Sequence, residues 1–226
     1  MSEKHNLESL LEKLPTLTDD ELKWDYLNKV EFTQPLGNII GSLEDFDLAL
    51  RVVKSAFDID IKLGAYLAGK VKQEWQEETV SLIDKLKFSP VLKIILLLKT
   101  QSETAIPRIT KFLDNEDSNI IKAAIIGLAN LNSDNAINQL IPLLEDKSKS
   151  YYIRLNVALA LLKKRSKLAV TTLLKLLTST DYGISRNIAS ILSKCESERK
   201  KIITRLKKVL TYKNPDPLSI AAFLAG

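Results

Sequence analysis

The sequence AIPRITKFLDNEDSNIIKAAIIGLANL, residues 105–131, recurs as AINQLIPLLEDKSKSYYIRLNVALALL, residues 136–162. Equivalent apolar residues of the two copies lie 31 or 32 positions apart: Ala105 and Ala136, Leu113 and Leu144, Ile121 and Ile153. A third copy covers residues 169–195, and a fourth covers residues 199–226. Self-similarity at such a period is typical of repeat proteins, in which each copy forms one unit of supersecondary structure.

Each copy contains two apolar segments with helical spacing, joined by a short polar turn. In the third copy Val170, Leu173, Leu174 and Leu177 recur at intervals of three and four, which places them on one side of a helix. One helix pair cannot bury such a stripe alone, whereas stacked pairs share a continuous core. The sequence therefore predicts an all-α fold, a right-handed α-α superhelix (a HEAT/ARM-like solenoid) of antiparallel helix pairs.

The first hundred residues are less regular but also carry helix signals. Thr18 and Glu21 have the spacing of a capping box, in which each side chain bonds the other residue's main-chain amide. Ser42 and Asp45 resemble a second helix start of this kind before Phe46. This part of the chain is therefore predicted to consist of helices that depart from the repeat.

The domain prediction follows from these two regions. We expect one solenoid domain over residues 1–226, with irregular helices over 1–100 and regular HEAT-like repeats over 101–226. Trp24 and Trp75 lie in the irregular part, where packing in the core or between domains is the expected role. The alternative for these two side chains is an exposed platform that stacks on a nucleobase or binds a peptide.

The repeated segments resemble a known family. The first three begin with Ala and Ile or Val, end the first helix with Leu-Leu or Phe-Leu, and continue through a polar turn into a second helix that contains Ala. Ile121-Lys122 and Ile153-Arg154 provide the apolar-basic pair, whereas the third copy has Ser185 there and its basic residue, Arg186, one position later. This pattern resembles HEAT repeats of the short bacterial type, which are also found in phycobilisome lyases.

A second resemblance concerns the entry to the repeats. The stretch DIKLGAYLAGKVKQEWQEETVSLI, followed by VLKIILLLKTQSETAIP, resembles the HEAT region of cyanobacterial proteins that carry an upstream NACHT-type nucleotide-binding domain. That resemblance implies a sensor or scaffold part of a larger protein, or a free-standing relative of it. HEAT repeats specify a fold much more than a function.

No catalytic motif stands out in the sequence. His5 and Cys195 are the only histidine and cysteine, too few for a zinc cluster, and neither GxxxxGK[ST] nor GxGxxG occurs. Acidic pairs such as Glu77-Glu78 are expected at helix starts, where the helix dipole favours carboxylates. We therefore expect no enzyme activity, no cofactor and no metal.

Charge is distributed unevenly along the chain. Residues 1–146 contain 16 Lys or Arg and 24 Asp or Glu, a net charge of −8, whereas residues 147–226 contain 17 and 4, a net charge of +13. The candidate partner-binding residues are the basic side chains of the second helices and of one turn: Lys122, Arg154, Arg186, Lys163, Lys164 and Arg165. Two alternatives stay open, because such residues also bond the preceding acidic turn or serve as a solvated face.

The function that we expect is a non-catalytic scaffold or sensor that binds a protein through the solenoid surface, and an acidic protein is one candidate partner. The alternative is nucleic-acid binding through the basic C-terminal half. Weaker alternatives are a bilin-lyase-like or a DNA-glycosylase-like HEAT protein, and a homodimer formed through an uncapped C-terminal repeat. The short apolar runs predict no membrane span, and the lone cysteine and the N-terminal sequence predict a cytoplasmic protein.

Overall fold

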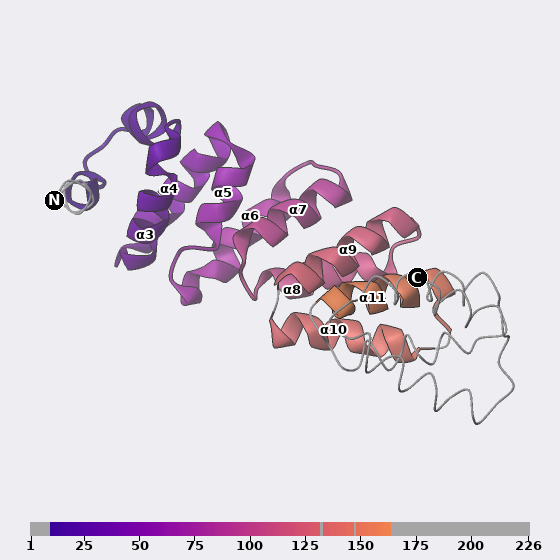
Figure 1. Ribbon diagram of the computed structural model, residues 1–226. Coiled ribbons are helices and arrows are strands. Elements are labelled where there is room, and N and C mark those ends of the chain that lie inside the picture. Colours follow the sequence, from indigo (N-terminus) through magenta and orange to yellow (C-terminus); the bar gives the residue numbers. More distant parts are fainter. Residues whose placement is uncertain (1–9, 132, 147, 164–226) are drawn as a thin grey trace, which may run out of the picture. The chain divides into compact units, whose positions relative to one another are not determined.

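The computed structural model describes residues 10–131, 133–146 and 148–163 (Figure 1). Within these residues every regular element is a helix, and no strand occurs, which confirms the all-α prediction. The chain divides into two compact units, residues 1–136 and 137–226. The third and fourth sequence repeats lie outside the described residues, so the arrangement of the whole array stays a prediction.

The described helices are short and follow one another closely. In the first unit they are α2 (Asp19–Glu21), a π-helical turn (Leu22–Leu27), a 3-10 turn (Val30–Phe32), α3 (Thr33–Ser42), α4 (Phe46–Ile59), α5 (Ile61–Ala68), a 3-10 turn (Gln73–Trp75), α6 (Gln76–Lys85), α7 (Pro90–Thr100), α8 (Ala105–Thr110), a 3-10 turn (Lys111–Asp114) and α9 (Ser118–Leu131). Helix α10 (Asp134–Glu145) begins at the boundary between the units, and α11 (Tyr151–Lys163) belongs to the second unit.

Side-chain hydrogen bonds cap the starts of α2 and α4. The predicted capping box is present, because the Glu21 amide donates to Thr18 Oγ1 at 3.2 Å and the Thr18 amide donates to Glu21 Oε2 at 2.8 Å. The second predicted start is shifted. Asp45 is the N-cap of α4 and accepts from the Leu48 amide, whereas Ser42 is the last residue of α3 and donates its hydroxyl to the Ile39 carbonyl.

The core of the first unit lies where helices α4 to α9 pack against one another. Helix α5 packs against α4 and α7, and α7 in turn packs against α9. Helices α6 and α8 also pack against α7, and α8 packs against α9 (Figure 1). The largest fully buried side chains of these helices are aliphatic: Leu67, Ile83, Leu96, Leu97, Ile109, Ile125 and Leu128. Helices α5, α7 and α9 therefore form a continuous series of neighbours.

The repeat alignment correctly identified core positions in the first two copies. Ala105 and Ala136 are both fully buried, and Leu113 and Leu144 are both buried. The third pair is less symmetrical, because Ile121 is buried and Ile153 is only half-buried. Two of the three equivalent pairs are therefore buried in both copies.

The two tryptophans do not share one environment. Trp75 is half-buried, and its ring lies 5.6 Å from that of Phe46, in agreement with a packing role. Trp24 is 59% exposed in the π-helical turn, so its predicted place in the core is wrong. The two residues also differ in local structure, because Trp24 lies inside the π-helical turn and Trp75 is the N-cap of α6.

Helices α5 and α7 approach each other most closely at Gly69, the residue after α5. A Cβ atom at this position would lie 1.9 Å from the main-chain oxygen of Thr100 at the end of α7. The same junction is held by Gln76, whose amide donates to the carbonyls of Gly69 and Val71 and accepts from the Ser102 hydroxyl. Only glycine fits here without moving the backbone of one helix.

We expect Gly69→Ala to lower the free energy of unfolding by about 3 kcal/mol or more, because a main-chain oxygen cannot rotate away from the added methyl group. Gly127→Ala is the matched control. Its Cβ would lie 3.0 Å from the movable Cγ2 of Ile94, and alanine is preferred in a helix, so the net change should stay within about 1 kcal/mol. Urea unfolding of both variants tests this prediction, and equal losses would contradict it.

Candidate partner-binding surface

The series α5, α7 and α9 exposes aliphatic side chains. Val91 and Ile95, one turn apart on α7, are 38% and 47% exposed, and Ile126 on α9 is 45% exposed. The contact between the two helices lies beside these residues, because Ile94 packs against Gly127. Exposed aliphatic side chains therefore occur on both of these neighbouring helices. We call the exposed side of the three helices the α5–α7–α9 face.

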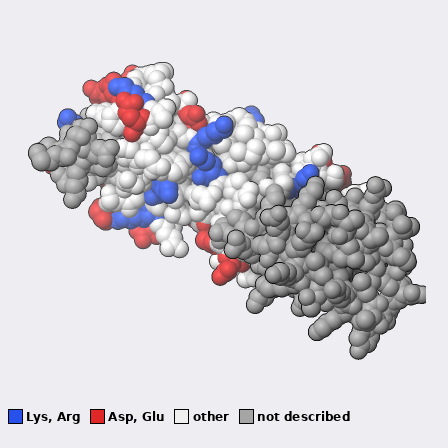
Figure 2. All heavy atoms as spheres, viewed as in Figure 1, with Lys and Arg blue, Asp and Glu red and all other residues white. Residues whose placement is uncertain are grey.

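Lysines lie among the apolar residues of this face. The sequences of α5, α7 and α9 contain Lys62, Lys93, Lys99 and Lys122, and they contain no Asp or Glu. Lys93 donates to the main-chain oxygen of Asp84, whereas Lys62, Lys99 and Lys122 are exposed. On the side of the molecule seen in Figure 2, basic side chains gather over the middle of the described surface and acidic ones lie mostly toward its borders.

A hollow of about 450 Å³ lies at the α5 end of the face. Its walls include Val30, Leu63, Tyr66 and Lys99, and Val30 is 86% exposed. The Tyr66 ring lies against Gly37 of α3, where a Cβ atom would be 2.6 Å from the phenolic oxygen. Asn28, Thr33, Gln34, Asp60 and Lys62 also line the hollow, so its walls are of mixed character and include one carboxylate and two ammonium groups.

Tyr66 also carries two cation–π contacts. The Nζ atoms of Lys70 and Lys99 lie 5.4 Å and 5.9 Å from its ring centroid. A contact of this kind at an exposed site stabilises by about 0.5–1 kcal/mol and leaves most of the ammonium hydration and charge in place. Both lysines can therefore still attract an anionic group.

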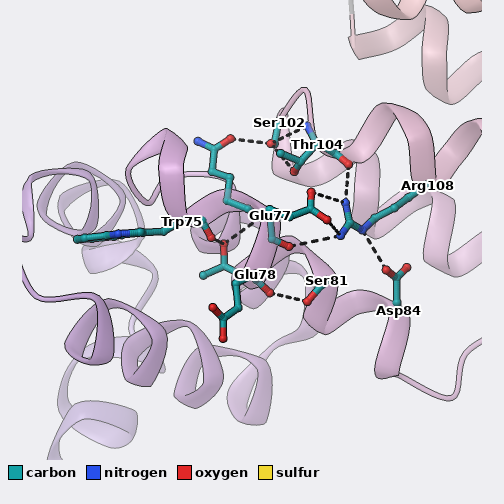
Figure 3. Close-up of polar contacts among 10 residues, drawn as sticks. Trp75, Glu77, Glu78, Ser81, Asp84, Ser102, Thr104 and Arg108 are labelled. Atoms are coloured by element: carbon teal, nitrogen blue, oxygen red, sulfur yellow. Dashed lines mark hydrogen bonds and ion pairs between the residues drawn. The ribbon is translucent and has the colours of Figure 1, made fainter.

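The most heavily bonded side chain of the first unit, Arg108, stands behind this face (Figure 3). Arg108 is 8% exposed and lies on α8. Its Nη2 donates to Glu77 Oε1 at 2.6 Å, its Nε donates to Asp84 Oδ2 at 2.9 Å, and its Nη1 donates to the Thr104 carbonyl at 2.7 Å. The guanidinium thus joins α6 to α8, the two helices that pack against α7.

This network shifts the ionisation of its members. Hydrogen bonds from Arg108 lower the pKa of Glu77 below its ordinary value, and the bond to Glu77 raises the pKa of Arg108 above its ordinary value. Each group favours the charged form of the other, because a charge-assisted hydrogen bond is strongest when both partners are ionised. The network is therefore fully formed at neutral pH.

The structure places only two of the predicted partner-binding side chains. Lys122 is exposed on α9, as expected for a contact residue. Arg154 is half-buried on α11, and its Nε donates to the Leu144 carbonyl at 3.1 Å, which matches the structural alternative for this position. The side chains of Lys163, Lys164, Arg165 and Arg186 lie outside the described part of the chain.

Sequence reasoning missed Arg108 and the hollow. In the repeat alignment Arg108 corresponds to Gln139, which is exposed, so the pattern indicates an ordinary surface position. Arg108 is buried because its partners, Glu77 and Asp84, come from the helix that precedes the repeats. The absence of acidic residues from residues 90–100 and 118–131 was the available signal for the α5–α7–α9 face.

Two other features, a metal cluster and a membrane-spanning helix, are absent from the described residues. Over residues 10–131, 133–146 and 148–163, no group of three or more His, Cys, Asp or Glu side chains is arranged to hold a metal ion. In this same part of the chain, none of the helices combines the length and the apolar character required to cross a bilayer. Glu77 and Glu78 lie in the first turn of α6, as predicted.

Comparison with known proteins adds no family to this description. No protein-family model matches the chain, and no curated protein matches its sequence significantly.

We expect the double variant Glu77→Ala/Asp84→Ala to lower the free energy of unfolding by about 3 kcal/mol, because it leaves a buried guanidinium without a counter-charge. Arg108→Met should cost less, since it removes the buried charge together with its desolvation penalty and keeps a similar shape. Urea unfolding of the two variants gives the comparison. A larger loss of unfolding free energy for Arg108→Met would contradict the idea that the carboxylates stabilise the fold mainly by compensating the buried charge.

The lowered pKa of Glu77 predicts a pH-dependent part of the stability. A carboxylate with a lower pKa in the folded state stabilises that state above its unfolded pKa, and this contribution disappears as the pH falls through the folded value. The stability difference between the wild type and Glu77→Gln should therefore be full at neutral pH and shrink below the ordinary value of 4.5. Denaturant unfolding over this range measures it, with Glu78→Gln as the control. A difference that stays constant as the pH falls would contradict the assignment.

Proposed function

We propose that the chain is a non-catalytic scaffold or sensor module that binds a partner protein through the α5–α7–α9 face, within an array of HEAT-like helix pairs. The observation that carries this proposal is the presence of Ile95 and Ile126, both nearly half exposed, on two helices in direct contact. Single exposed aliphatic side chains are common on soluble proteins, but adjoining ones on neighbouring helices favour an interaction surface.

Two further features support a protein partner. The exposed aliphatic residues alternate with lysines, as at the border between the apolar centre and the polar rim of an interface. The helices behind the face are joined by Arg108, so the surface is held in one arrangement before a partner arrives. A preformed surface loses less conformational entropy on association, which leaves more of the contact energy for affinity.

A second candidate function is nucleic-acid binding through the C-terminal half. The observation that favours it is the net charge of +13 over residues 147–226. Such binding would weaken steeply with added salt, because each phosphate contact releases counterions. The two candidates use different parts of the chain and can be separated by substitution.

We expect the full chain to capture a specific protein from an extract of its source cells, and Ile95→Glu/Ile126→Glu to lose that protein. Each substitution places a charge on the apolar area, and the loss should correspond to about 2 kcal/mol or more of binding free energy. The control is Lys54→Glu/Lys85→Glu, two exposed positions on α4 and α6. Circular dichroism checks that both variants fold.

Two outcomes would contradict the proposal. Capture of the same protein by Ile95→Glu/Ile126→Glu would place the binding site elsewhere. Salt-sensitive capture of nucleic acid that is lost on neutralising Lys163, Lys164 and Arg165 would favour the second candidate.

A further inference from the structure

The α5–α7–α9 face is basic, although the part of the chain that contains it is acidic overall. Residues 1–146 have a net charge of −8, yet the helices α5, α7 and α9 contain four lysines and no acidic residue. The acidic residues lie instead on α4, on α6 and in the turns, for example Asp47, Glu77 and Asp84. The sign of the face is therefore a property of three particular helices and not of the overall composition.

The exposed lysines of this face also lack counter-charges. Some basic side chains elsewhere in the first unit pair closely with carboxylates: Lys23 with Asp58 at 2.6 Å, and Lys72 with Glu44 at 2.6 Å. Others, such as Lys54 and Lys85, form no ion pair among the described residues. Lys62, Lys99 and Lys122 form no ion pair over the described ranges. Their charge is available to a ligand, and a partner that brings carboxylates would not have to break an internal pair.

Exposed apolar side chains lie on the same helices as these lysines. Val91 and Ile95 lie on the same helix as Lys99, at successive turns, and Ile126 lies one turn after Lys122. The hollow beside Tyr66 has a mixed lining, in which Val30 and Leu63 offer apolar contacts and Lys99 offers a charge. A complementary ligand therefore carries large apolar side chains with acidic groups one helical turn or a few residues away.

We propose that the occupant of the α5–α7–α9 face is an acidic segment of a partner protein with large apolar side chains, one of which enters the hollow beside Tyr66. This inference rests on the proposed function and specifies the chemistry of the partner. The carboxylates of the segment meet Lys99 and Lys122, and its apolar side chains cover Ile95 and Ile126. Val30, almost fully exposed, contacts the side chain in the hollow.

A nucleic acid fits this face less well than an acidic peptide. Binding to a phosphate backbone requires many closely spaced cations, because each neutralised phosphate contributes to affinity. Here three free lysines are spread over three helices and are separated by aliphatic side chains that have no counterpart on a sugar-phosphate chain. Charge pairs at the exposed rim set orientation and exclude basic partners more than they add affinity.

The test uses the intact chain and a display library of random peptides. We expect selection to enrich sequences in which Asp or Glu flanks Leu, Phe or Trp. Synthetic copies of these peptides should bind Lys99→Glu/Lys122→Glu at least about tenfold more weakly, because two attractive pairs become repulsive. They should also bind Val30→Asp more weakly, and bind the charge-matched control Lys54→Glu/Lys85→Glu with unchanged affinity.

The outcomes separate this inference from the proposed function. Enrichment of neutral or basic peptides whose binding is abolished by Ile95→Glu/Ile126→Glu would overturn the acidic partner and leave the face as a docking surface. Peptides that bind this double variant normally would overturn both proposals. Displacement of the selected peptides by a short RNA or DNA duplex, with loss of duplex binding in Lys99→Glu/Lys122→Glu, would assign the face to nucleic acid.

Discussion

Compensation of one buried charge organises the first unit of this protein. Arg108 is almost fully buried, and a guanidinium in that position is tolerated only where carboxylates and main-chain oxygens surround it. Glu77 and Asp84 supply the charges from α6, and the Thr104 carbonyl supplies a further acceptor from the start of α8. Because these groups must stay together, α6 and α8 cannot move independently. The buried guanidinium and its two carboxylate partners thus fix the relation between the irregular helices and the first sequence repeat.

The fixed pair of helices determines what α7 can expose. Helices α6 and α8 both pack against α7, and α5 and α9 occupy its two sides, so one side of α7 is left open. Close approach at Gly69 brings α5 next to the end of α7, which places Tyr66 within cation–π distance of Lys99. The exposed isoleucines, the lysines and the hollow are therefore parts of one surface. Its rigidity comes from contacts on the opposite side of the helices.

Sequence periodicity was sufficient for the helical class and for part of the core. Ala105, Leu113, Ala136 and Leu144 were found from the repeat alone, because a residue that packs between stacked helices must be apolar in every copy. Periodicity failed where a partner lies outside the repeat. Arg108 looks like a surface residue until α6 is placed, and Trp24, expected to pack in the core or between domains, is exposed in the π-helical turn. Of the predicted partner-binding residues, Lys122 is exposed as a contact residue would be, and Arg154 bonds the main chain.

The central claim is that the α5–α7–α9 face is where a partner docks, and site-specific photo-cross-linking in the source cells tests it most directly. A photoreactive amino acid is placed at Ile95 or at Ile126, and in matched chains at Lys54 or at Lys85 on α4 and α6. The account predicts one cross-linked protein common to positions 95 and 126 and absent from positions 54 and 85. Cross-linking of that protein from α4 or α6, with none from positions 95 and 126, would contradict it.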